Sequence, residues 1–204
     1  MDGTLTESRH DFPAISRALG LPENEPILEA LNRLPPEQFA QCHRQLADIE
    51  IDIARQATPQ PGAPELLSDL LSQNKHIGIL TRNTKDIART TLAACGLADF
   101  FCADNIVGRS CCRPKPHPDG IFKLLAAWSA AATDAVMTGD HPFDLLTGRN
   151  AHTATVYLAP NDLAANDLAP GYLASDDHFP AQAHADYIVQ SLHHLRKLNR
   201  PPHN

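Results

Sequence analysis

The chain has 204 residues, a mass of 22.2 kDa and 43% hydrophobic residues, enough for one buried core and a small accessory unit. A formal net charge of -7, without any run of lysines or arginines, excludes nucleic acid and anionic membranes as electrostatic partners. Because no apolar stretch approaches the roughly 20 residues that span a bilayer, and no signal-peptide pattern is present, we expect a cytoplasmic protein. We expect it to be a monomer or a homodimer.

The segment from residue 8 to residue 58 has helical patterns and no strand pattern. Helices are predicted over Phe12–Leu19, Glu25–Leu31 and Pro36–Arg55. The sequence Pro59-Gln60-Pro61-Gly62 then predicts a stiff return into a further helix around Leu66 to Leu71. We therefore predict a small helical cap at 8–58, inserted into a core made of 1–7 and 59–204.

The remainder of the chain alternates between strands and helices. Ile77 to Thr81 is a short apolar run typical of a strand buried on both faces of a parallel sheet, and a helix is predicted after it from Thr84 to Ala94. Further strands are predicted at 105–107, 135–138, 154–158 and 187–189, and further helices at 119–130, 142–150 and 192–198. This alternation predicts an α/β fold with a doubly wound, Rossmann-like parallel sheet. Residues 159–184 have weak periodicity and predict a loop-rich excursion.

Four polar segments fall at the carboxyl ends of core strands, where ligands bind in open parallel sheets. They are Asp2-Gly3-Thr4, then Thr81-Arg82-Asn83, then Lys115 within Arg113-Pro114-Lys115-Pro116-His117-Pro118-Asp119, and finally Asp140 with Asp144. Each segment also has a plain structural explanation. In chain order these are a turn, a helix-capping threonine, a solvated lysine, and an N-capping aspartate followed by a surface aspartate.

The residue types in these segments suit phosphate chemistry. Prolines on both sides of Lys115 fix the direction of its ammonium group, which can then neutralise a phosphate. The Thr81 hydroxyl and the N–H groups after it can hold phosphoryl oxygens. Asp140 and Asp144 would repel each other unless a hard cation such as Mg²⁺ lay beside them. His117 and His141 flank these segments, and we do not assign them catalytic roles.

Taken together and in this order, the segments resemble the motifs of the haloacid dehalogenase-like (HAD) superfamily. The helical insertion resembles the C1-type cap of its phosphoglycolate phosphatase-like branch. The resemblance implies that Asp2 is the general acid and base, and that the nucleophilic aspartate of the first motif stands just ahead of Met1. That residue, and the first core strand that ends in it, are therefore expected upstream of this chain, within roughly 10 to 20 further residues.

The resemblance implies a Mg²⁺-dependent phosphatase that hydrolyses a small phosphorylated metabolite through an aspartyl-phosphate. Its implied catalytic residues are Asp2, Thr81 and Lys115, its substrate-binding residues are Thr81, Arg82, Asn83 and Lys115, and its metal ligands are Asp2, Asp140 and Asp144. Without the upstream nucleophile the chain is expected to be nearly inactive. A non-catalytic binding protein and a phosphomutase remain as alternatives.

Overall fold

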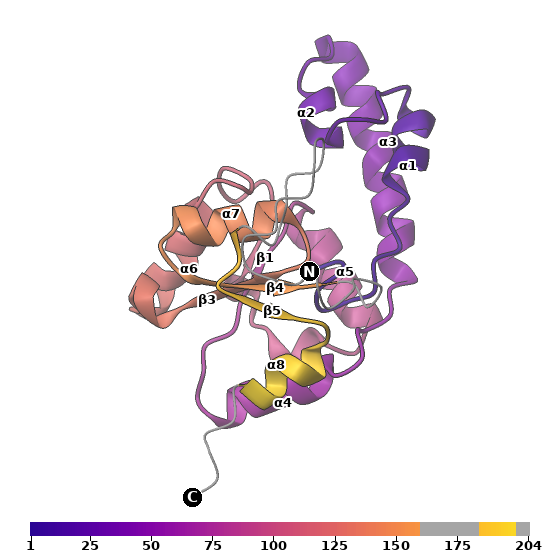
Figure 1. The fold of residues 1–204 in the computed structure, drawn as a ribbon. Helices are drawn as coiled ribbons and strands as arrows, with labels where there is room; N and C mark the ends of the chain where they lie inside the picture. The colour runs from indigo at the N-terminus through magenta and orange to yellow at the C-terminus, as the bar shows by residue number, and fades with distance from the viewer. Residues whose placement is uncertain (160–183, 199–204) are drawn as a thin grey trace, which may run out of the picture.

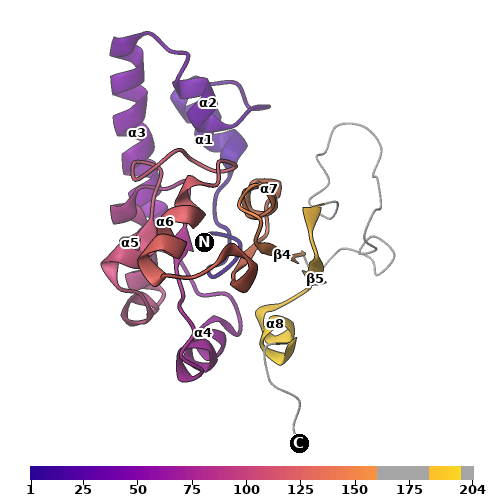
Figure 2. The same ribbon diagram turned by 90° about the vertical axis from the view of Figure 1, so that its left-hand side faces the viewer.

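The structure is a computed structural model that describes residues 1–159 and 184–198 (Figure 1). Helices α1, α2 and α3 stand to one side of a core of parallel strands flanked by helices, as Figures 1 and 2 show from two directions. The predicted α/β class is therefore confirmed. The predicted loop-rich excursion lies almost wholly outside the described residues. Within the described part, no helix is long and apolar enough to cross a membrane.

The helical segment consists of α1 (Phe12–Leu19), α2 (Ile27–Leu31) and α3 (Pro36–Arg55). These helices share a hydrophobic core of their own, with buried members Ile15, Leu19, Leu21, Ala30, Leu31 and Leu46. Helix α1 begins where the Asp11 carboxylate accepts a hydrogen bond from the Ala14 N–H at 2.9 Å. Helix α2 begins at Ile27 rather than at the predicted Glu25. A residue that precedes proline avoids the helical region, and Glu25 precedes Pro26.

The core contains two parallel sheets within the described residues. One pairs β1 (Ile79–Leu80) with β2 (Ile106–Val107), and the other has the order β3 (Val136–Gly139), β4 (Ala154–Leu158), β5 (Tyr187–Val189). The covering helices are α4 (Ala63–Ser72), α5 (Lys85–Ala94), α6 (Asp119–Trp128), α7 (Pro142–Asn150) and α8 (Leu192–Leu198). Successive strand residues face opposite sides, so Ile79 packs with α4 and α5 whereas Leu80 packs with α6.

A cavity of about 560 Å³ separates the two sheets. It lies between β1 and β3, whose facing edges pair with no strand among the described residues. Leu66 and Leu67 of α4 and Leu124 of α6 line this slot, and Met1 also borders it. Strand β1 is shorter than the predicted Ile77 to Thr81 because it pairs only with the two residues of β2.

Candidate active site

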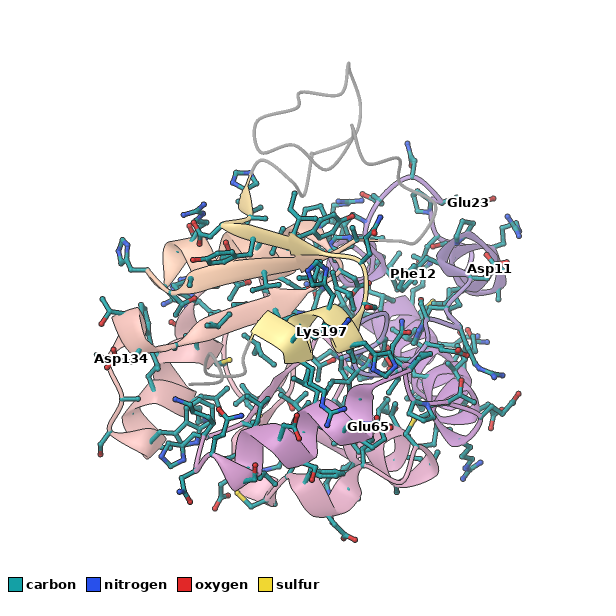
Figure 3. The ribbon with its side chains drawn as sticks, turned by 60° about the horizontal axis from the view of Figure 1, so that its bottom comes forward. Asp11, Phe12, Glu23, Glu65, Asp134 and Lys197 are labelled. Carbon is teal, nitrogen blue, oxygen red and sulfur yellow. The ribbon has the colours of Figure 1, made fainter. Side chains whose placement is uncertain are left out.

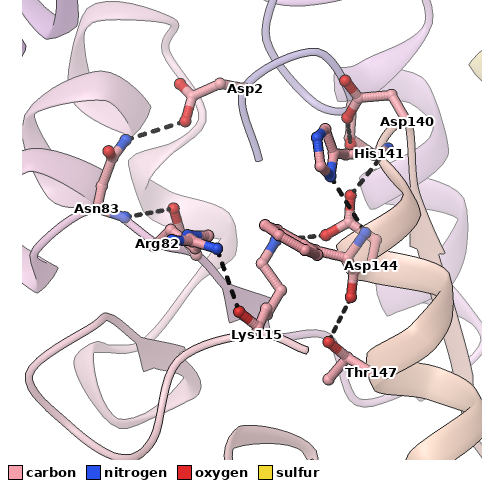
Figure 4. Close-up of polar contacts among 11 residues, drawn as sticks. Asp2, Arg82, Asn83, Lys115, Asp140, His141, Asp144 and Thr147 are labelled. Carbon is pink, nitrogen blue, oxygen red and sulfur yellow. Dashed lines mark hydrogen bonds and ion pairs between the residues drawn. The ribbon is translucent and has the colours of Figure 1, made fainter. Parts of the chain in front are cut away.

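The first polar segment packs directly against Asp140, which follows β3. Thr4 Oγ1 donates a hydrogen bond to Asp140 Oδ1 at 2.6 Å. Gly3 has a φ of +79°, and a Cβ atom at this position would lie 1.9 Å from Asp140 Oδ2. Glycine is therefore required for the backbone to approach this carboxylate so closely. The contact brings Asp2 and Asp140 to the same site, as Figure 4 shows.

The loop after β1 brings Asn83 to Asp2. Asn83 Nδ2 donates to Asp2 Oδ2 at 2.9 Å. Thr81 is buried, and its Oγ1 accepts a hydrogen bond from the Asn83 N–H at 3.1 Å. Thr81 does not cap helix α5, because that role belongs to Thr84, whose Oγ1 accepts from the Ile87 N–H at 3.3 Å. Burial places the Thr81 hydroxyl in the interior of the site and not at a helix end.

Arg82, which we predicted to bind substrate, lines the cavity and points towards the helical cap. Its Nη2 donates to both carboxylate oxygens of Glu29 in α2, at 2.7 and 2.6 Å. Its Nη1 donates to the Lys115 carbonyl oxygen at 3.3 Å, and its guanidinium lies 4.7 Å from the centre of the Phe143 ring. The charge of Arg82 is therefore already compensated by a carboxylate of the cap.

Lys115 and Asp144 form a buried ion pair, with side chains 8% and 4% exposed. Burial opposes ionisation of Asp144, but the Lys115 ammonium and a hydrogen bond from the His141 N–H at 3.2 Å hold its pKa below the ordinary value. The explanations of a solvated lysine and a surface aspartate are therefore wrong. Asp140 does not cap helix α7 either, because the Nδ1 of His141 accepts from the Phe143 N–H at 3.1 Å.

His141, to which we gave no catalytic role, lines the same cavity as Asp2 and Lys115. Burial lowers the pKa of its imidazole below the ordinary 6.5, although the carboxylates of Asp144 and Asp140 act in the opposite direction. The neutral ring can accept the hydrogen bond that starts α7. His141 therefore helps to position Asp144 at the start of that helix.

The Asp140 carboxylate is a suitable ligand for a divalent cation, and the family resemblance implies a second ligand in the backbone carbonyl oxygen of Asp2. Mg²⁺ commonly takes one or two protein carboxylates together with waters and phosphate oxygens, and this donor set fits that pattern. Asp144, also predicted as a ligand, forms a buried ion pair with Lys115 and thereby fixes the position of that lysine. Among residues 1–159 and 184–198 no group of three or more His, Cys, Asp and Glu side chains is arranged to hold a metal ion.

A cavity of about 510 Å³ lies between the cap and these residues. From the core it is lined by Met1, Asp2, Thr81, Arg82, Asn83, Arg109, Lys115, His141, Phe143 and Asp144. Arg109 was not among the predicted site residues; its Nη1 and Nη2 donate to the two oxygens of Glu50 in α3 at 2.7 and 2.9 Å. The rule that ligand sites lie beyond strand ends could have found Arg109, because it follows β2 closely.

Comparisons with known proteins show which family and fold the chain resembles. Residues 3–158 match the sequence model of the haloacid dehalogenase-like hydrolases. Pyrophosphatase PpaX of Halalkalibacterium halodurans is 26% identical over 171 residues, covering 82% of this chain and 72% of that protein. Phosphoglycolate phosphatase of Rhodospirillum rubrum is 32% identical over 120 residues, covering 59% of this chain and 49% of that protein. The crystal structure of a hydrolase from Pseudomonas syringae shares the fold, with a TM-score of 0.72 and 24% identity over 98% of this chain and 96% of that one.

Proposed function

This chain belongs to the haloacid dehalogenase-like hydrolases, and from that premise we propose that it is a Mg²⁺-dependent phosphatase that hydrolyses a small phosphorylated metabolite through an aspartyl-phosphate. One observation carries this proposal. Segments far apart in the sequence place Asp2, Thr81 and the buried pair of Lys115 and Asp144 around a single cavity. Carboxylates, a fixed ammonium and a buried hydroxyl are the groups that phosphoryl transfer requires.

Each residue has a defined part in the proposed reaction. The Lys115 ammonium, held in place by Asp144, compensates the negative charge of the transferring phosphoryl group. The Thr81 hydroxyl and the N–H groups after β1 bind its oxygens. Asp2 donates a proton to the leaving alkoxide and then accepts one from the attacking water. The Asp140 carboxylate and the backbone carbonyl of Asp2 would hold Mg²⁺, which supplies charge stabilisation and orientation.

We propose in addition that, in the active form, an apolar strand ending in aspartate precedes Met1. The slot between β1 and β3 supports this, since it has apolar walls and an unpaired strand edge on each side among the described residues. A strand of about 5 or 6 residues would pair with both edges and end beside Asp2. Its terminal carboxylate would be the nucleophile, so the chain that starts at Met1 should have very low activity.

The proposal is tested by phosphate release from p-nitrophenyl phosphate, with and without Mg²⁺. Two purified forms are compared: the 204-residue chain and a form extended at Met1 by such a strand. Mg²⁺-dependent turnover in the extended form alone is the expected result. Turnover in neither form would contradict the proposal and favour a non-catalytic binding protein. A requirement for a sugar bisphosphate, with little free phosphate released, would indicate a phosphomutase.

A further inference from the structure

The part of the 510 Å³ cavity beyond the phosphate-binding residues is formed by the cap. Its described lining residues on that side include apolar Phe12, Ile15, Ile27, Leu28 and Leu46, and acidic Glu23, Glu25 and Glu50. No lysine or arginine of the described cap residues lines it. Figure 3 shows Phe12 and Glu23 among the cap helices. Glu23 pairs with Arg17 and Glu25 with Arg33, and neither of these arginines lines the cavity. This side of the cavity therefore combines apolar surface with paired carboxylates, and its described lining offers an anionic ligand no cationic side chain.

The two core arginines at the cavity are both bound by cap glutamates. Arg109 and Glu50 are buried, with side chains 9% and 8% exposed, and both terminal nitrogens of Arg109 are bound to the Glu50 carboxylate. Arg109 Nη1 also donates to the Arg82 carbonyl oxygen at 3.2 Å. Arg82 is bound by Glu29 through Nη2 alone, which donates to both carboxylate oxygens, and this pair is more open, with side chains 19% and 43% exposed. A second anionic group of a substrate would have to compete with a glutamate for either arginine, and displacement of Glu50 would leave a buried carboxylate uncompensated.

The cap side also offers a free hydrogen-bonding atom. His10 Nδ1 is buried and has no hydrogen-bond partner among the described residues. The His10 ring stacks on Phe12 with a centroid distance of 5.4 Å, and both residues line the cavity. An imidazole nitrogen in this position suits a hydroxyl or amine group on a ligand that also has an apolar face.

We infer that the group carrying the phosphate in the substrate is a neutral or cationic, partly apolar alcohol, and that substrates with a second anionic group are disfavoured. This inference rests on the proposed function, because it assumes that the phosphate lies beside Lys115. It argues against phosphoglycolate and pyrophosphate, whose leaving groups carry a second anion, because the arginines at the cavity are already paired with the cap carboxylates Glu29 and Glu50. Competition with these carboxylates for the arginines should weaken binding by about tenfold or more.

A matched set of ligands tests the inference on the 204-residue chain with Mg²⁺ present. Glucosamine 6-phosphate, glucose 6-phosphate and 6-phosphogluconate carry the same phosphate on similar six-carbon frames, and differ in having a cationic, a neutral and an anionic remainder. Isothermal titration calorimetry should show that 6-phosphogluconate binds at least about tenfold more weakly than glucose 6-phosphate, and that glucosamine 6-phosphate binds at least as tightly as glucose 6-phosphate. Orthophosphate serves as the control for the phosphate site.

Substitution of Glu29 by Gln tests whether the ion pairs cause this selectivity. Glu29→Gln frees Arg82 and should improve binding of 6-phosphogluconate relative to glucose 6-phosphate by several-fold to about tenfold. Glu37→Gln makes the same charge change at an exposed cap residue outside the cavity lining and should leave that ratio unchanged. A merely structural role of Glu29 would not produce a gain for one ligand.

The outcomes separate this inference from the proposed function. If 6-phosphogluconate binds as tightly as glucose 6-phosphate, or if orthophosphate binds and none of the three sugar phosphates does, the inference is overturned. An unchanged ratio in Glu29→Gln would show that the ion pairs do not set selectivity, which also overturns it. Failure of orthophosphate itself to bind would count against the proposed function, and the inference would fall with it.

Discussion

Replacement of Lys115 by Met should destabilise the protein strongly, because it leaves the Asp144 carboxylate buried without its cation. Both side chains are less than a tenth exposed, at 8% and 4%. Removal of one partner from a buried ion pair typically costs about 3–5 kcal/mol of unfolding free energy. Asp144 keeps the hydrogen bond from the His141 N–H, so we expect about 3 kcal/mol. For a chain of this size, that loss lowers Tm by about 6–12 °C.

Urea unfolding followed by circular dichroism measures this loss, and a double variant identifies its cause. Lys115→Met with Asp144→Asn removes both charges and keeps an acceptor for the His141 N–H, so its stability should lie within about 1 kcal/mol of the original chain. A loss below about 1 kcal/mol in Lys115→Met, or strict additivity of the two substitutions, would refute the reasoning.

Three further predictions concern other parts of the molecule. Gly3→Ala should lower Tm more than Gly20→Ala, because both positions have positive φ but only a Cβ at Gly3 collides with Asp140; equal shifts in thermal unfolding would contradict this. Asp140→Asn should weaken Mg²⁺ binding in calorimetry by about tenfold or more, and unchanged affinity would exclude Asp140 as a ligand. Although partial burial opposes it, hydrogen bonds from Thr155 lower the pKa of Asp186 below the ordinary 3.8. Above pH 3.8, Asp186→Asn should therefore lower the unfolding free energy by roughly 1 kcal/mol. This difference from the original chain should disappear as the pH falls through the folded-state pKa of Asp186, as measured by urea titrations across that range.

The local patterns of the sequence were sufficient for the α/β class and for several site contacts. The prolines around Lys115 and the aspartates after an apolar strand predicted Lys115 and Asp144 as site residues. The structure brings these two side chains together as a buried ion pair. Hydrophobic periodicity and strand-end polarity are local signals, so they can be read directly from neighbouring residues.

The missed features depend on contacts between distant segments. Glu29, which pairs with the predicted substrate-binding residue Arg82, stands 53 residues away in the sequence. The pairing of Arg109 with Glu50 spans 59 residues and joins the core to the cap. Charge alone does not say which partner an arginine takes. Such pairings become visible only when the cap and the core are packed together.

The role of Asp2 as the general acid provides the most direct test of the central claim. In the extended form, kcat/KM is measured for p-nitrophenyl phosphate, whose leaving group needs no proton, and for an alkyl phosphate, whose alkoxide does. Asp2→Asn should reduce kcat/KM for the alkyl phosphate by about 10²–10⁴ and for p-nitrophenyl phosphate by clearly less. An equal loss for both substrates, or no loss for the alkyl phosphate, would contradict the account.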